Sequence, residues 1–216
     1  QEQEQLHLRC SWEDQQEQQY PLMRKADLQV YPNRSDSHGY HSEAVPVVQE
    51  PEDFEEFWAK NLQQVAKVPL APKMELLPDR CTDKVDVYHV SYGNIGGSRM
   101  YGVLTMPKAP GKYPGILRMP GAGVHAIGGN TVNAAQGAII LELGIHGIPV
   151  VLDPSVYGAL GSGALGSYYV NGIEDRDSYY YRRVYLGCVK GIDFLLSLPN
   201  CNGKIGTLGG SQGGAL

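Results

Sequence analysis

The stretch Leu208-Gly209-Gly210-Ser211-Gln212-Gly213-Gly214 contains a serine with a glycine two positions before it and another two positions after it. This G-x-S-x-G spacing is typical of a sharp turn between a strand and a helix that exposes a nucleophilic serine. A serine hydroxyl attacks a carbonyl only if it is exposed, close to a base and beside donors for the developing oxyanion. Such a turn brings backbone segments close together, and glycines at the two flanking positions leave room for it. The pattern predicts Ser211 as a nucleophile.

The residues before the motif supply the context that the motif requires. The bare string also occurs in glycine-rich turns, and this chain has 27 glycines among its 216 residues. However, Lys204-Ile205-Gly206-Thr207-Leu208 predicts a short buried strand, and the apolar periodicity of residues 178–198 predicts a helix before it. The order helix, turn, strand and G-x-S-x-G favours a functional site over a plain turn.

The central part of the chain alternates between expected strands and expected helices. We expect a helix that opens at Pro51, strands over 85–92, 99–106, 115–119 and 147–153, a helix over 133–143, and a mobile loop over 157–166. This alternation predicts an α/β fold with a mostly parallel sheet and flanking helices.

Residues 1–48 differ from the rest of the chain, because Gln and Glu dominate their beginning. We expect them to form an extended N-terminal arm or the tail of a preceding β domain, and we expect residues 49–216 to form the α/β domain. The chain begins with Gln rather than Met, so a removed leader is one expectation, and with it a secreted or periplasmic location.

Composition limits the classes of partner. A formal net charge of -5 gives no support for nucleic acid or an anionic membrane as a partner. No apolar run approaches the ~20 residues of a membrane span. The four cysteines show no C-x-x-C pairing, and His38 and His41 fall in a polar stretch that is typical of a loop. We therefore expect no metal and no cofactor, and the composition leaves the oligomeric state open.

A second candidate for the site follows the strand expected at 115–119. The segment Pro120-Gly121-Ala122-Gly123-Val124 consists mostly of small residues. Where a G-x-S-x-G turn carries the nucleophile, the loop after the third strand of the sheet supplies one backbone N–H to the oxyanion hole. Small residues suit this role because the backbone must approach the substrate carbonyl closely. A plain glycine-rich turn is the alternative.

Three stretches together resemble one family, the acetyl xylan esterases that include the cephalosporin-C deacetylases, within the α/β hydrolases. These stretches are Pro51-Glu52-Asp53-Phe54-Glu55-Glu56-Phe57-Trp58, Gly172-Ile173 followed by Tyr179-Tyr180-Tyr181-Arg182-Arg183-Val184, and Ile205-Gly206 through Gly209-Gly210-Ser211-Gln212-Gly213-Gly214. The resemblance covers about residues 50–216. It implies an α/β-hydrolase fold of which this chain holds the N-terminal part.

The resemblance also implies an activity. It indicates a serine carboxylesterase that removes small acyl groups, above all acetyl, from sugars or xylan-derived oligosaccharides through an acyl-enzyme on Ser211. The backbone N–H groups of Gln212 and Ala122 are then the oxyanion hole. The family usually has a His-Gly-Tyr string at Pro120-Gly121-Ala122, so this chain keeps a backbone donor there but lacks an aromatic wall. The alternatives are a prolyl-oligopeptidase-like serine peptidase and a non-catalytic carbohydrate-binding relative.

The triad partners of the serine are missing from their expected place. In this fold the acid and the base follow the nucleophile in the chain. None of the five residues after Ser211 is His, Asp or Glu, and all six histidines precede it. His146 is expected on the sheet edge opposite the elbow, the turn that carries Ser211. We therefore expect a fragment of a longer protein, inactive by itself, whose nucleophile strand is an exposed edge.

Overall fold

The computed structural model describes residues 50–216. The chain forms two compact units that meet between Gln63 and Gln64 in the sequence, and helix α1 (Phe54–Ala66) runs across this boundary. The helix predicted to open at Pro51 is present and begins at Phe54. Acidic residues lie in its first turn, where they interact favourably with the positive end of the helix dipole.

The arm or β-domain tail expected for residues 1–48 lies outside the described residues. The boundary at residue 48 therefore stays a prediction.

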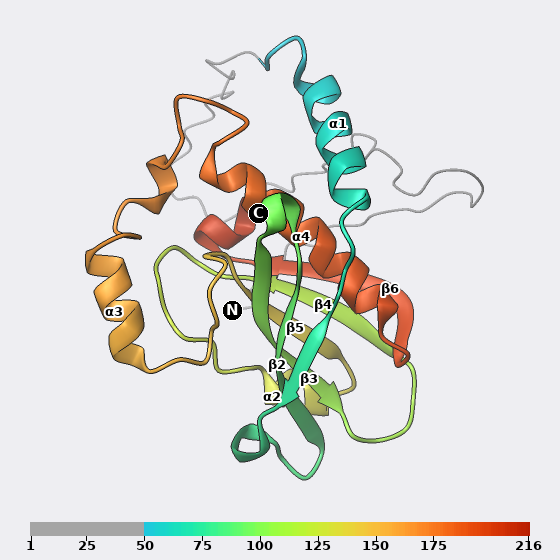
Figure 1. The fold of residues 1–216 in the computed structure, drawn as a ribbon. Coiled ribbons are helices and arrows are strands. Elements are labelled where there is room, and N and C mark those ends of the chain that lie inside the picture. The colour runs from blue at the N-terminus through green and yellow to red at the C-terminus, as the bar shows by residue number, and fades with distance from the viewer. Residues whose placement is uncertain (1–49) are drawn as a thin grey trace, which may run out of the picture. The chain divides into compact units, whose positions relative to one another are not determined.

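The unit that begins at Gln64 is built on a six-stranded sheet with the order β1-β2-β3-β5-β4-β6 (Figure 1). The strands are β1 (Lys73–Leu76), β2 (Val85–Gly93), β3 (Arg99–Pro107), β4 (Tyr113–Met119), β5 (Ile139–Gly144) and β6 (Cys201–Gly209). Neighbours are antiparallel from β1 to β5, whereas β5, β4 and β6 are parallel to one another. The sheet is therefore mixed, and its parallel half ends in β6. Among the described residues β6 pairs with β4 alone, so it forms the edge that the sequence predicted. Most of its residues are exposed, so the prediction of a buried strand over 204–208 is wrong, because an edge strand has a neighbour on one side only.

Two elements in the middle of the chain differ from the prediction. The helix predicted over 133–143 is confined to α2 (Thr131–Ala135), and Ile139–Gly144 form β5. This apolar run lies between β3 and β4, where both of its faces are buried, and a run buried on both faces has no period that distinguishes strand from helix. Residues 147–153, predicted as a strand, form bends.

The stretch 157–166, predicted as a mobile loop, begins inside helix α3 (Pro154–Ser162). Asp153 caps this helix, because its carboxylate accepts a hydrogen bond from the Ser155 backbone N–H at 2.9 Å. Proline at the first helical position is compatible with the helix, since it needs no donor there. Tyr157 is buried and therefore marks the side of α3 that faces the rest of the protein.

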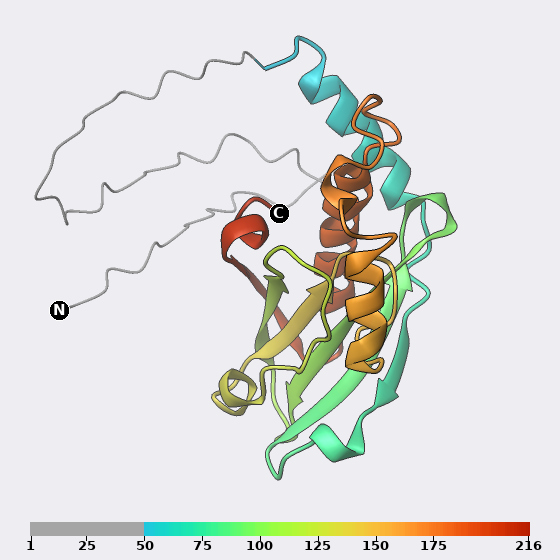
Figure 2. The same ribbon diagram turned by 90° about the vertical axis from the view of Figure 1, so that its left-hand side faces the viewer.

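Helix α4 (Tyr180–Ser197) agrees with the helix predicted over 178–198 and packs against the sheet (Figure 2). Gly187 and Gly191 lie one turn apart on its buried side. The hydroxyl of Tyr92 in β2 donates a hydrogen bond to the Gly187 carbonyl at 3.1 Å, which ties the helix to the strand.

The core has two parts, one on each face of the sheet. In β5, Ile139, Leu141 and Leu143 belong to the cluster that includes α4, and Ile140 belongs to a cluster that includes α2. This assignment follows the alternation of side chains along a strand. The central strands are therefore buried on both faces, whereas the edge strands β1 and β6 are mostly exposed.

Candidate active site

The chain makes an unusual turn directly after β6. The strand ends at Gly209, and a short 3₁₀ turn, η4 (Ser211–Gly214), follows it. Ser211 is exposed and has a backbone φ of +54°. Non-glycine residues rarely adopt this left-handed region, which costs on the order of 1–3 kcal/mol. A serine held in this conformation between a strand and a helical turn has the backbone geometry of a nucleophile elbow.

Gly209 and Gly213 are required by close approach of the backbone. A Cβ atom on Gly209 would lie 2.0 Å from the Gly213 carbonyl oxygen, and one on Gly213 would lie 2.6 Å from the Met119 carbonyl oxygen. At Gly210 a Cβ atom would meet no atom within 4 Å. The two glycines of the motif thus allow the turn to fold back onto β6 and to lie against the end of β4.

The loop after β4 (residues 120–124), called here the oxyanion loop after the role that the sequence predicts for it, lies beside the elbow because β4 and β6 are parallel neighbours. The Gln212 side chain approaches the Gly121 carbonyl oxygen, with 3.4 Å between Nε2 and the oxygen. No acceptor within residues 50–216 is hydrogen-bonded to the backbone N–H of Ala122 or of Gln212. Ser211, Gln212 and Ala122 therefore lie at the same end of the sheet, because β4 and β6 are parallel neighbours.

Two tyrosines hold the side chain of Gln212. Its Oε1 accepts hydrogen bonds from the hydroxyl of Tyr168 at 2.5 Å and from that of Tyr181 at 2.6 Å. Burial raises the pKa of Tyr181, as do the neighbouring tyrosines, so its hydroxyl stays a donor at neutral pH. Neither Tyr168 nor Tyr181 was predicted from the sequence as a residue of the site. The cluster of tyrosines over residues 168–181 was the available signal, but it has no spacing that points to Gln212.

His146 lies near the oxyanion loop, and the prediction that it lies on the opposite sheet edge is wrong. It follows β5, the parallel neighbour of β4. Its Nε2 is 2.9 Å from the Gly123 carbonyl oxygen and its Nδ1 is 2.7 Å from the Tyr180 hydroxyl. A carbonyl only accepts, so Nε2 carries the proton and Nδ1 accepts from Tyr180. Burial lowers the pKa of His146, and the charge of Arg183 also lowers it. Both ring nitrogens are engaged, so neither is free to take a proton from Ser211.

No general base for Ser211 is present in the described part of the chain. No His, Asp or Glu of residues 50–216 forms a hydrogen bond with Ser211. These residues also contain no group of three or more side chains arranged to bind a metal ion. None of the helices between residues 50 and 216 has the length and apolar character needed to cross a lipid bilayer.

The architecture is that of an α/β hydrolase, as the sequence predicted. The acetyl xylan esterase from Paenibacillus sp. R4 has a similar structure, with a TM-score of 0.62, 25% identity, and coverage of 78% of this chain and 55% of that one. Acetyl xylan esterase 1 from Thermoanaerobacterium sp. JW/SL YS485 has a TM-score of 0.65 at 22% identity, over 76% of this chain and 52% of that one. The second similarity supports the fold alone.

The chain belongs to the acetyl xylan esterase (AXE1) family, whose sequence profile matches residues 39–216. A curated relative, the acetyl esterase Axe7A of Xylanibacter ruminicola, is 38% identical over 177 residues, which are 79% of this chain and 40% of that protein. The resemblance inferred from three short stretches is therefore confirmed. The chain spans 40% of the length of this curated relative and about half of the two solved structures.

Proposed function

We propose that the protein is a serine esterase that removes acetyl groups from carbohydrates, with Ser211 as its nucleophile. The observation that carries the proposal is the φ of +54° at Ser211, in a turn whose flanking glycines have no room for a side chain. Membership of the acetyl xylan esterase family supports the acetyl group and the sugar as the two halves of the substrate.

In the proposed reaction, the Ser211 hydroxyl oxygen attacks the acetyl carbonyl while a base takes its proton. The negative charge on the carbonyl oxygen is stabilised by the backbone N–H groups of Gln212 and Ala122. The bond from the acetyl carbon to the sugar oxygen then breaks, and the sugar leaves with the proton from the base. Water hydrolyses the acetyl ester of Ser211 by the same steps, which releases acetate and restores the serine.

The proposal assigns the base and its orienting acid to residues of the protein outside this sequence. In this fold class both follow the nucleophile in the chain, and His146, which contacts the loop after β4, has both ring nitrogens engaged. A complete protein is therefore needed for every activity measurement below.

Substitution of the nucleophile tests the proposal. In the complete protein, Ser211→Ala should lower kcat on p-nitrophenyl acetate by about 10⁴ to 10⁶, because the attacking atom is removed. A fluorophosphonate probe should label the wild type and not the variant. Retention of a tenth of the rate would exclude Ser211 as the nucleophile. Failure to label the wild type would favour a non-catalytic carbohydrate-binding relative, and preference for peptides over acetyl esters would favour a peptidase.

The donor at Ala122 can be tested separately. Ala122→Pro removes the backbone N–H and should lower kcat by on the order of 10², the contribution of one oxyanion donor. Circular dichroism must show that the variant is folded, since proline also restricts the backbone. A folded variant with the wild-type kcat would place the second donor elsewhere.

A further inference from the structure

Tyr168 joins the elbow to the oxyanion loop through a single hydroxyl group. It lies in a short 3₁₀ turn, η3 (Tyr168–Val170), and the residue is only 4% exposed. The hydroxyl donates to Gln212 Oε1 at 2.5 Å and accepts a hydrogen bond from the Gly123 backbone N–H at 3.2 Å. One oxygen atom is therefore bonded both to the residue after Ser211 and to the residue after Ala122.

The direction of these hydrogen bonds is fixed by chemistry. The Gly123 N–H can only donate, so the oxygen of Tyr168 accepts from it and the hydroxyl proton goes to Gln212. Gln212 Oε1 accepts from Tyr168 and Tyr181, which leaves its Nε2 to face the Gly121 carbonyl. If the amide were turned around, its oxygen would face the Gly121 carbonyl oxygen, and two acceptors would meet with no proton between them. Only one arrangement satisfies every group.

The ring of Tyr168 is held in place by other aromatic rings. The imidazole of His146 meets it edge-on, with 4.7 Å between ring centroids and 84° between planes, and the ring of Tyr180 lies 5.3 Å away. His146 also holds the Gly123 carbonyl, while Tyr168 holds the Gly123 N–H. Both polar groups of Gly123 are therefore bonded to packed side chains.

Ala122 lies between two peptide groups that are both contacted from this network. Its N–H shares a planar peptide with the Gly121 carbonyl, which faces Gln212 Nε2 at 3.4 Å. The next peptide group, that of the Ala122 carbonyl and the Gly123 N–H, is held at this N–H by Tyr168. Gly123 has a φ of +119°, and nothing in its own covalent structure would hold it there, since glycine also adopts many other conformations. The hydrogen bond from the Gly123 N–H to Tyr168 restricts this freedom.

The geometry points to Tyr168 as a positioning residue that aligns the two backbone donors of the oxyanion hole, those of Gln212 and Ala122. This inference rests on the proposed function. Tyr168 contacts the side chain of Gln212 and the backbone N–H of Gly123, and it acts on the reaction through these two residues. The oxyanion forms only along the reaction coordinate. Loss of the Tyr168 hydroxyl should therefore affect kcat far more than KM.

The test is Tyr168→Phe in the complete protein, which removes one oxygen atom and keeps the ring. We expect kcat on p-nitrophenyl acetate to fall by about tenfold to a hundredfold, no more than the loss of a whole donor, with KM within about twofold of the wild type. Affinity for an aryl trifluoromethyl ketone, to which the serine adds to form an oxyanion, should weaken by a factor similar to the fall in kcat/KM. Tyr181→Phe leaves the Gly123 contact intact and should cost less.

Tyr169→Phe is the matched control, because Tyr169 is exposed and its backbone carbonyl, not its ring, makes the hydrogen bond to Tyr179. It should leave kcat, KM and ketone affinity unchanged. A folded Tyr168→Phe with wild-type kcat and ketone affinity would overturn the positioning role, and so would an equal loss in Tyr169→Phe. A wild-type protein whose turnover does not depend on Ser211 would instead overturn the proposed function, and this inference with it.

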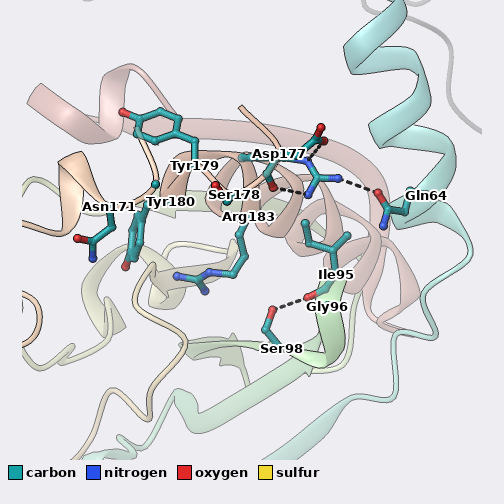
Figure 3. A pocket seen from close by; sticks show the side chains of 12 residues that line it. Gln64, Ile95, Gly96, Ser98, Asn171, Asp177, Ser178, Tyr179, Tyr180 and Arg183 are labelled. Atoms are coloured by element: carbon teal, nitrogen blue, oxygen red, sulfur yellow. Dashed lines mark hydrogen bonds and ion pairs between the residues drawn. The ribbon is translucent and has the colours of Figure 1, made fainter. Parts of the chain in front are cut away.

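A separate pocket lies on the N-terminal side of α4. It has a volume of about 390 Å³ and is lined by Gln64, Asp177 and Arg182 among others (Figure 3). Its Arg182 donates to the Gln64 side chain at 2.8 Å and to the Asp177 carbonyl at 2.9 Å. The Arg182 guanidinium is thus bonded within the protein. That of Arg183, which also lines the pocket, donates to the Ile145 carbonyl at 3.0 Å and lies over the Tyr180 ring.

Discussion

Ser211 occupies a strained backbone conformation, and its neighbours rather than its own side chain keep it there. The turn can close only because Gly209 and Gly213 have no Cβ atom, and the Gln212 side chain is bonded to two tyrosines. Strain of this kind persists only where the surroundings determine it, and it commonly marks reactive sites. At the scale of single residues, the site is therefore defined as much by the absence of side chains as by the serine hydroxyl.

Gly213→Ala should damage the site, and Gly210→Ala should not. The added methyl at position 213 would lie 2.6 Å from the Met119 carbonyl oxygen, a backbone atom that cannot move without moving the oxyanion loop. A displacement of about 1 Å at a reacting centre can cost 10²-fold in rate, and we expect a fall in kcat of that order. At position 210, φ is -124° and the space is open, so alanine fits. Equal kcat values for the two variants would contradict this account.

Helix α4 lies close to the sheet because two of its residues have no side chain. A Cβ atom on Gly191 would lie 2.8 Å from the hydroxyl of Tyr92, which is fully buried and bonded to Gly187. In α3, a Cβ atom added at Gly158 would meet no other atom within 4 Å. The two helices thus contain glycine for different reasons, one for packing and one without a steric requirement.

Alanine at these two positions should have opposite effects on stability. At Gly158 it removes the helix penalty of glycine and should raise the free energy of unfolding by up to about 1 kcal/mol. At Gly191 the same gain is opposed by overpacking, which costs about 1–3 kcal/mol, so we expect a net loss. Urea denaturation followed by circular dichroism measures both values. A stabilising Gly191→Ala would show that Tyr92 can move aside at little cost.

On the scale of the whole molecule, two histidines couple stability to pH. Burial lowers the pKa of both His89 and His146 from the usual 6.5. The Nε2 atom of His89 is buried and has no hydrogen-bond partner among residues 50–216. Since both groups bind a proton more readily in the unfolded chain, their contribution to stability is complete above the unfolded pKa of 6.5 and is lost as the pH falls toward their folded pKa values.

We therefore expect the urea midpoint to fall as the pH is lowered from about 8 to about 5. His146→Gln and His89→Gln should each make this dependence shallower. Asp153 and Asp175 have a lowered pKa because each accepts hydrogen bonds from nearby residues, so their effect appears only at more acidic pH. A midpoint that stays constant over this range, or an unchanged slope in both variants, would contradict the assignment.

The sequence by itself determined the elements whose local signals are strong. The strands β2 and β3, the long helix α4, the strand β6 and the elbow were all predicted, because alternation, helical periodicity and turn glycines lie within short stretches; the burial expected for β6 was not found. The family was also readable from short strings. Ser211 was predicted as a nucleophile from the spacing of three residues, and its φ of +54° is consistent with that role.

Only the tertiary structure decided the middle of the chain and the environment of the elbow. Residues 139–144 are a strand because they insert between β3 and β4, and a run buried on both faces has no period of its own. The place of His146, and the link from Tyr168 to both Gln212 and Gly123, depend on contacts between residues more than 20 positions apart. Such contacts follow from the order in which strands lie in the sheet, which no short stretch of sequence encodes.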